Sequence, residues 1–128
     1  MSVIEEIRMD LEGAELLADW LGEGGIPVGR EKAESRSVIC EACRMNRPGR
    51  IWESIKHMAA LWIRKELEVR NKLGLQLPND DKLGICNGCR CCNGLKVWTP
   101  IKHIKAHMSP EVIQKLDPSC WIKGEMNE

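Results

Sequence analysis

The sequence predicts a mainly α-helical fold with a small zinc-knuckle β-hairpin, an α+β arrangement stabilised by metal. Two long segments repeat apolar residues at helical spacing, and glycines stand where each segment should end. The segment ICNGCRCCNG, residues 85–94, places four cysteines within seven positions, a density typical of metal-binding chains. The chain has 128 residues, which is enough for one domain with an appended helix.

Residues 1–25 are expected to form an acidic amphipathic helix. Residues 1–29 contain seven acidic side chains against one base, Arg8, whereas residues 40–110 carry 13 bases against six acids. This polarity suits either docking of the helix on the rest of the chain or a basic face that meets an acidic partner. The helix should end in the sequence GEGGIP, because glycine and Pro27 disfavour helix. Its apolar stripe comprises Val3, Ile7, Leu11, Ala14, Ala18 and Leu21.

Residues 26–128 are expected to form a cysteine-rich metal-binding domain around a central helix at residues 50–73. Good helix formers dominate that segment, and Gly74 is placed to end it. A short helix at residues 29–39 should lead to Cys40. One stripe of the central helix comprises Ile51, Ile55, Met58, Trp62, Val69 and Leu73, widened by Trp52, Ala59, Ile63 and Leu67.

The remaining elements are expected to be short. Residues 46–49 (NRPG) are typical of a turn, and residues 95–98 (LKVW) of a strand in a hairpin near 85–98. Capping residues followed by proline, at Thr99-Pro100 and Ser109-Pro110, predict two helices at about 100–107 and 110–116.

Two C-x2-C pairs, Cys40 with Cys43 and Cys86 with Cys89, are the primary candidate metal ligands. This spacing lets both sulfurs of a pair reach one zinc ion at about 2.3 Å. The 42 residues between Cys43 and Cys86 exceed the gap of a compact zinc ribbon, so a helix must be inserted between the two pairs.

Other partitions of the ligands stay open. The pattern C-x2-C-x-C, completed by Cys91, could use Cys120 as a fourth ligand, and the first pair could then use His103 and His107, spaced i, i+4. Cys92 is the one cysteine that is not expected to bind metal. The candidate ligands are therefore Cys40, Cys43, Cys86, Cys89, Cys91 and Cys120.

Zinc is the expected cofactor, because four thiolates complete a closed structural site. An iron–sulfur cluster is less favoured, since a bacterial ferredoxin run repeats C-x2-C and ends in Cys-Pro, and neither feature follows Cys89. A redox dithiol is disfavoured because no βαβ pattern precedes either pair.

The sequence predicts a non-enzymatic protein that acts through protein–protein contacts. It has no glycine-rich phosphate loop, nucleophile elbow or carboxylate pair near its histidines. No apolar run reaches the roughly 20 residues of a membrane span, and the acidic N-terminus is unlike a secretory signal. Five tryptophans, residues frequent at interface hot spots, stand in a chain without phenylalanine or tyrosine.

Two alternative functions remain. The basic residues near both pairs, with Trp98 available to stack on a base, could bind nucleic acid. The density of thiols could instead indicate an iron–sulfur electron carrier. The basic residues concerned are Arg44, Arg47, Arg50, Lys96, Lys102 and Lys105.

Several segments resemble small cysteine-rich proteins encoded by tailed bacteriophages and prophages. They are LADWLGEGGIPV, CEACRMNRPG, IRKELEVRNKLGL, DDKLGICNGCRCC, LKVWTPIKHIKAHM and SCWIK. The resemblance covers all six candidate ligands, and it departs at Cys92, where such proteins are expected to have proline. It implies a phage or prophage origin and little about mechanism. With the uneven charge and the five tryptophans, a virion or host protein is then the expected partner, and the expected location is the virion or the host cytoplasm, without secretion. The group carries no established activity.

Overall fold

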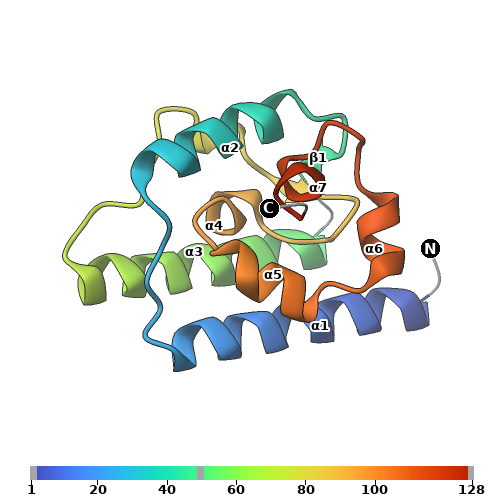
Figure 1. Cartoon of the computed structure of the whole chain (residues 1–128), viewed down its shortest axis with the longest axis horizontal. Coiled ribbons are helices and arrows are strands. Elements are labelled where there is room, and N and C mark those ends of the chain that lie inside the picture. The colour runs from blue at the N-terminus through green and yellow to red at the C-terminus, as the bar shows by residue number, and fades with distance from the viewer. Residues whose placement is uncertain (1–2, 49–50, 127–128) are drawn as a thin grey trace.

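The computed structural model describes residues 3–48 and 51–126 and is mainly helical (Figure 1). Two short strands, β1 (Asn46–Arg47) and β2 (Ile85–Cys86), pair antiparallel, with Asn46 opposite Cys86. The predicted class, mainly α with a small β-element, is confirmed. The helices are α1 (Val3–Gly22), α2 (Arg30–Ala42), α3 (Ile51–Asn71), α4 (Asn93–Lys96), α5 (Ile101–His107), α6 (Pro110–Lys115) and α7 (Trp121–Glu125), with a 3-10 turn η1 at Asp80–Lys82.

The predicted place of the β-structure, a hairpin near 85–98, is right only in part. Strand β2 lies at Ile85–Cys86, and Ile85 makes an antiparallel bridge to Cys92. Residues 95–98 form no strand, because Leu95 and Lys96 belong to α4. The sheet instead joins the segments before and after α3. Residues 46 and 47, predicted in a turn, form β1, because the Asn46 side chain accepts the Gly84 N–H at 2.8 Å and donates to the Lys82 carbonyl at 2.8 Å.

The helix boundaries follow the predictions closely except near the C-terminus. The helix predicted at 29–39 extends to Ala42, and the pairs Thr99-Pro100 and Ser109-Pro110 precede α5 and begin α6. Helix α7 was not predicted. Gly49 of the predicted turn and Arg50, the predicted start of the central helix, lie outside the described residues.

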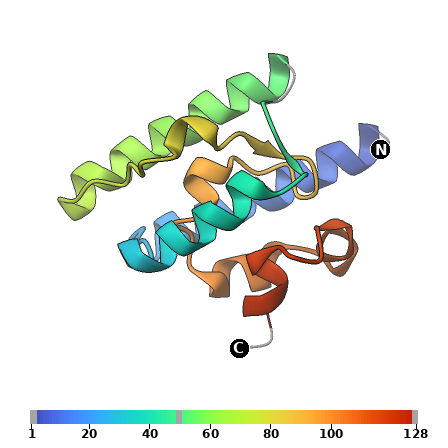
Figure 2. The same cartoon turned by 90° about the horizontal axis from the view of Figure 1, so that it is seen from above.

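The segment of residues 92–99, which contains α4, is buried along its whole length and lies at the centre of the molecule in both views (Figures 1 and 2). Two buried arginines from neighbouring helices bind its carbonyl groups. Arg36 of α2 donates to the carbonyls of Val97 and Thr99 at 3.0 and 2.8 Å, and Arg64 of α3 donates to that of Gly94 at 3.2 Å. Each bond satisfies a backbone acceptor that burial removes from water.

Helix α1 turns a different face to the core from the one its apolar stripe predicts. Met9, Leu16 and Trp20 are buried, whereas Ile7 and Leu11 are exposed. The side chain of Val3 lies outside the described residues. Helix α1 packs mainly on α5.

Helix α3 follows its predicted stripe only in part. It buries Leu67 of the widened stripe together with the charged residues Glu53 and Arg64, whereas Met58 and Trp62 of the stripe are 67 and 81% exposed. The side chains of Ile51 and Trp52 lie outside the described residues. Two long helices therefore present apolar residues to the outside of the molecule.

Across residues 3–48 and 51–126, the structure contains no helix that combines the length and the apolar character needed to cross a membrane.

Candidate metal centre

Three separate parts of the chain bring cysteines to one place. Cys40 lies near the end of α2 and Cys43 directly follows this helix, and the β1–β2 pairing sets the same turn against Cys86. From the C-terminal part, Cys120 directly precedes α7. Trp121 ties the last part to the first, because its indole N–H donates to the Sγ of Cys40 at 3.2 Å.

These parts enclose a cavity of about 10 Å³, close to the smallest space that holds one water molecule. Four cysteines line it, and its other walls come from Ile39, Asn46, Asn93 and Lys96. A single ion is therefore of suitable size for the cavity. The four cysteines are Cys40, Cys43, Cys86 and Cys120.

Lys96 places a positive charge at the same point. It is only 5% exposed, and its Nζ lies 3.4 Å from the Sγ of Cys89. Burial lowers the pKa of Lys96, but nearby thiolates, that of Cys89 foremost, raise it well above its ordinary value. Because a buried ammonium needs a negative partner, Lys96 acts to lower the pKa values of the surrounding thiols, although burial outweighs it at Cys40 and Cys120.

Several of the sulfurs accept hydrogen bonds from N–H groups. The backbone N–H of Met45 donates to Cys43 at 3.4 Å. The hydrogen bond to the Cys89 side chain raises the pKa of Cys86 and burial raises that of Cys120, and the backbone N–H groups of Cys89 and Ile122 offset these increases only in part. Such N–H donors commonly surround metal-bound thiolates and orient them. The donor set thus fits a thiolate-bound metal.

In the absence of a cation, most of these thiols hold their protons. Burial raises the pKa of Cys40 and of Cys120. At Cys89, a hydrogen bond from Cys86 lowers the pKa, but the bond to Cys91 and burial outweigh it and raise the value to about 12. A metal ion must therefore displace protons when it binds, and its affinity should rise with pH.

The sulfurs lie near one another, but the distances between them are too long for one tetrahedral metal site. No three of the chain's cysteine sulfurs, all of which lie in the described part, are mutually within 4.8 Å. Four sulfurs at about 2.3 Å from one zinc ion would lie closer together than this. Formation of the complete site therefore requires the side chains to move toward the cavity centre.

Cys91 and Cys92 lie on the other side of the cluster. Both line a larger apolar cavity between α1 and α3. The Sγ of Cys92 is 2.9 Å from Nδ1 of His57, while Cys91 has a lowered pKa, chiefly through its hydrogen bond to Cys89. The structure thus separates Cys92 from the small cavity, and the ligand roles of Cys89 and Cys91 stay predictions.

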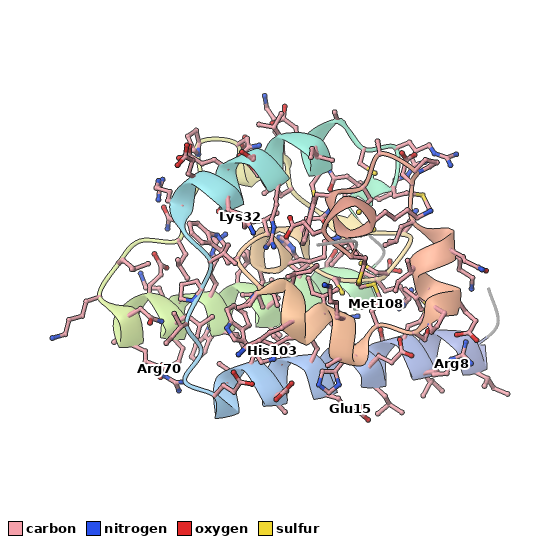
Figure 3. The ribbon with its side chains drawn as sticks, viewed as in Figure 1. Arg8, Glu15, Lys32, Arg70, His103 and Met108 are labelled. Carbon is pink, nitrogen blue, oxygen red and sulfur yellow. The ribbon has the colours of Figure 1, made fainter. Side chains whose placement is uncertain are left out.

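His103 and His107 of α5 lie with carboxylates of α1 and of the residue just after it, and Figure 3 shows His103 above α1. Asp19 Oδ2 is 3.0 Å from Nδ1 of His103 and 3.0 Å from Nε2 of His107. Glu23 lies 3.7 Å from Nε2 of His103 and pairs with Lys102 at 2.5 Å. The i, i+4 spacing of the histidines therefore serves the contact between α1 and α5.

Replacement of Asp19 by asparagine is expected to destabilise the protein in a pH-dependent way. Hydrogen bonds from His103 and His107 lower the pKa of Asp19 below 3.8. A carboxyl with a lowered folded-state pKa stabilises the fold above its unfolded pKa, and this contribution is lost as the pH falls through the folded pKa. In urea titrations, the difference in free energy of unfolding between wild type and Asp19→Asn should therefore shrink below about pH 4. A difference independent of pH would contradict this account.

The residues considered for nucleic-acid binding are mostly engaged elsewhere. Trp98 is 1% exposed and so cannot stack on a base in this structure. Arg44 pairs with Asp117 at 2.7 Å, and Lys102 pairs with Glu23 as described above.

Lys96 is not available to nucleic acid, contrary to the alternative prediction, because it is buried beside the Sγ of Cys89. The second role considered for these basic residues, to offset the negative charge of the cysteine sulfurs, fits its position. Its position within the apolar run 95–98, directly after the cysteine cluster, is the signal that could have identified it.

Comparison of the chain with protein-family models, with curated proteins and with solved structures gives no match.

Proposed function

We propose that the chain is a non-enzymatic accessory or virion-associated protein of a tailed bacteriophage or prophage. In this proposal it acts through contacts with a virion or host protein, in the virion or the host cytoplasm, and thiolate-bound zinc stabilises its fold. The observation that carries the proposal is an exposed apolar surface on two neighbouring helices. This surface, named the α1–α3 face here, comprises Ile7, Leu11, Ala14 and Ala18 of α1 and Ile55, Met58, Ala59 and Trp62 of α3.

Soluble monomers rarely expose large apolar patches, and such patches commonly mark interaction sites. Trp62 and Met58 lie one helical turn apart on α3, and tryptophan is the residue type most enriched at interface hot spots. Charged residues take the buried positions Glu53 and Arg64 of the same helix. The apolar residues that the core leaves out are therefore available to a partner.

Zinc would be held by Cys40, Cys43, Cys86 and Cys120, with Lys96 beside them. Four thiolates on one divalent ion leave a net charge of minus two, which the ammonium partly offsets. When bound, zinc supplies cross-links between distant parts of the chain, and a closed thiolate site leaves no position for water activation. This chemistry supports a structural role.

Replacement of Lys96 by methionine is expected to weaken metal binding by about 10- to 100-fold, the usual range for outer-shell partners. Methionine keeps most of the volume while it removes the ammonium that favours ionised sulfur. Competition with a zinc-responsive chelator measures the change in affinity. The matched control is Lys82→Met, because Lys82 is an exposed lysine on η1, and it should leave the affinity unchanged. An unchanged affinity for Lys96→Met would remove this residue from the centre.

The interaction itself is tested by co-purification with intact particles and by pulldown with the full, metal-loaded chain. The chain should appear in stoichiometric amounts with particles or with one partner protein. Met58→Lys should abolish this association, whereas Val38→Lys, at an exposed apolar position of α2, should not. A chain that is monomeric and without any partner in both experiments would contradict the proposed function.

A further inference from the structure

An apolar cavity of about 240 Å³ opens within the α1–α3 face. Helices α1 and α3 run alongside each other in the same direction in both views (Figures 1 and 2), and both contribute to its walls. Ala14 of α1 and Ala59 of α3 line the cavity and are also exposed, so they mark its mouth. Deeper walls come from Leu17, Ala60, Ile63, Leu95, Ile104 and Met108.

The cavity has the size and character of a receptacle for one aromatic side chain. Cavities of about 150 Å³ lined by aliphatic residues accept benzene, so 240 Å³ is enough for the larger indole ring. The polar side chains of the wall already have partners within the chain: Asp10 pairs with Lys56 at 2.6 Å, Lys96 lies 3.4 Å from the Sγ of Cys89, and Thr99 donates to the Leu95 carbonyl. An apolar group inserted here would therefore leave these contacts intact.

The most exposed large apolar side chain of the described residues stands next to this cavity. Trp62, 81% exposed, follows the mouth residue Ala59 by three positions and precedes the wall residue Ile63. The same surface thus carries both a projecting indole and a cavity that can receive one.

Charge does not oppose a partner of the same kind. Helix α1 carries six acidic residues against Arg8, whereas on α3 Lys56 already pairs with Asp10 of α1 and Arg64 is buried against Asp80. A two-fold axis parallel to the helices would place the acidic α1 of one copy against α3 of the other, whose remaining acids and bases outside the core balance. The chain has no net charge, so two copies do not repel each other over longer distances.

The available area also suits such a contact. Helices α1 and α3 contain 20 and 21 residues, so each is about 30 Å long and about 10 Å wide. Two of them side by side present roughly 600 Å² in projection. The accessible area of their protruding side chains is larger, which brings the face close to the roughly 800 Å² per partner of a stable interface.

We propose that the α1–α3 face binds a second copy of this chain around a two-fold axis, with Trp62 of each copy inserted into the cavity of the other. The inference rests on the proposed function and specifies it, since the virion protein that the α1–α3 face contacts would be a second copy of this chain. The dimer buries both apolar stripes and fills both cavities.

Sedimentation equilibrium of the metal-loaded full chain tests this dimer. At about 100 μM, well above the Kd of a micromolar complex, the chain of 14.5 kDa should sediment with twice that mass. Trp62→Ala should raise the dimer Kd at least about 30-fold, as expected for a hot-spot residue. Ala59→Leu, which fills the cavity from its mouth, should also weaken the dimer.

Val38→Ala is the matched control, because Val38 is an exposed apolar residue of α2 outside the face, and it should leave the Kd unchanged. Circular dichroism and metal content verify the folding of each variant, and Met58→Lys replaces any variant that does not fold. A wild-type monomer at the highest concentration would overturn the dimer, as would a dimer insensitive to all three face variants. If that monomer still associates with particles and Met58→Lys abolishes the association, the proposed function stands and this inference alone fails.

Discussion

Replacement of Cys86 by serine is expected to release the bound metal and to remove most of the free energy of unfolding. Cys86 belongs to every set of ligands considered. It is a member of the second C-x2-C pair and of the C-x2-C-x-C group, and it lines the small cavity. Structural zinc contributes on the order of 10 kcal/mol to folding, while domains of this kind are stable by only about 5–15 kcal/mol. Loss of one of four ligands should therefore leave the variant largely unfolded at 25 °C.

Metal content and near-ultraviolet circular dichroism measure this outcome, and strong chelation of the wild type should reproduce it. Cys92→Ser is the control, because Cys92 lies away from the small cavity and contacts His57. It should keep the full metal content. A Cys86→Ser variant with unchanged metal content and an unchanged unfolding midpoint would contradict the assignment of Cys86 as a ligand.

Replacement of Arg36 by alanine is expected to cost about 3–5 kcal/mol, the usual loss when one partner of a buried ion pair is removed. Arg36 is 2% exposed and binds both carboxylate oxygens of Glu125 at 2.9 and 2.6 Å. It also binds the two carbonyls at residues 97 and 99, and its guanidinium lies 4.1 Å from the centre of the Trp121 ring. One side chain thus joins α2, α7 and the central buried segment.

Urea denaturation with the metal-loaded protein measures the change in free energy of unfolding. The control is Arg44→Ala, since Arg44 makes a comparable pair with Asp117 at 2.7 Å but is largely exposed, and exposed pairs contribute about 0–1 kcal/mol. Equal losses for the two variants would show that burial does not set the contribution of Arg36.

The long helices could be predicted from the sequence because local signals define them. Apolar periodicity and glycine after the last turn act within a few residues, and so does the Ser109-Pro110 signal that starts the short helix α6. Helix α4 could not be predicted in this way, since four residues provide too little local preference. Its conformation depends on contacts such as that of Arg64 with the Gly94 carbonyl, which join residues 30 positions apart.

The orientation of α1 and α3 was less predictable than their existence. Each helix has apolar residues on more than one side, so the sequence alone does not say which side meets the core. On α3, Arg64 is buried because Asp80 and the Gly94 carbonyl receive its donors. A partner so distant in sequence overrides the preference of a single apolar stripe.

The convergence of the cysteines could be predicted from their spacing, whereas their arrangement could not. Two C-x2-C pairs indicate that distant segments meet, but only the fold decides which sulfurs share a cavity. That cavity joins both members of the first pair with Cys86 and Cys120. Lys96 enters the site through the helical geometry of α4, which the predicted strand would have placed differently.

The metal content of the native protein, determined by elemental analysis and native mass spectrometry, tests the central claim most directly. One zinc ion per chain is the predicted result. The measured mass should equal that of the chain plus one zinc ion minus the protons that the cysteine thiols release on binding. Iron with acid-labile sulfide would instead identify a cluster carrier. A folded chain free of any metal would contradict the claim that a thiolate-bound ion unites its three cysteine-bearing segments.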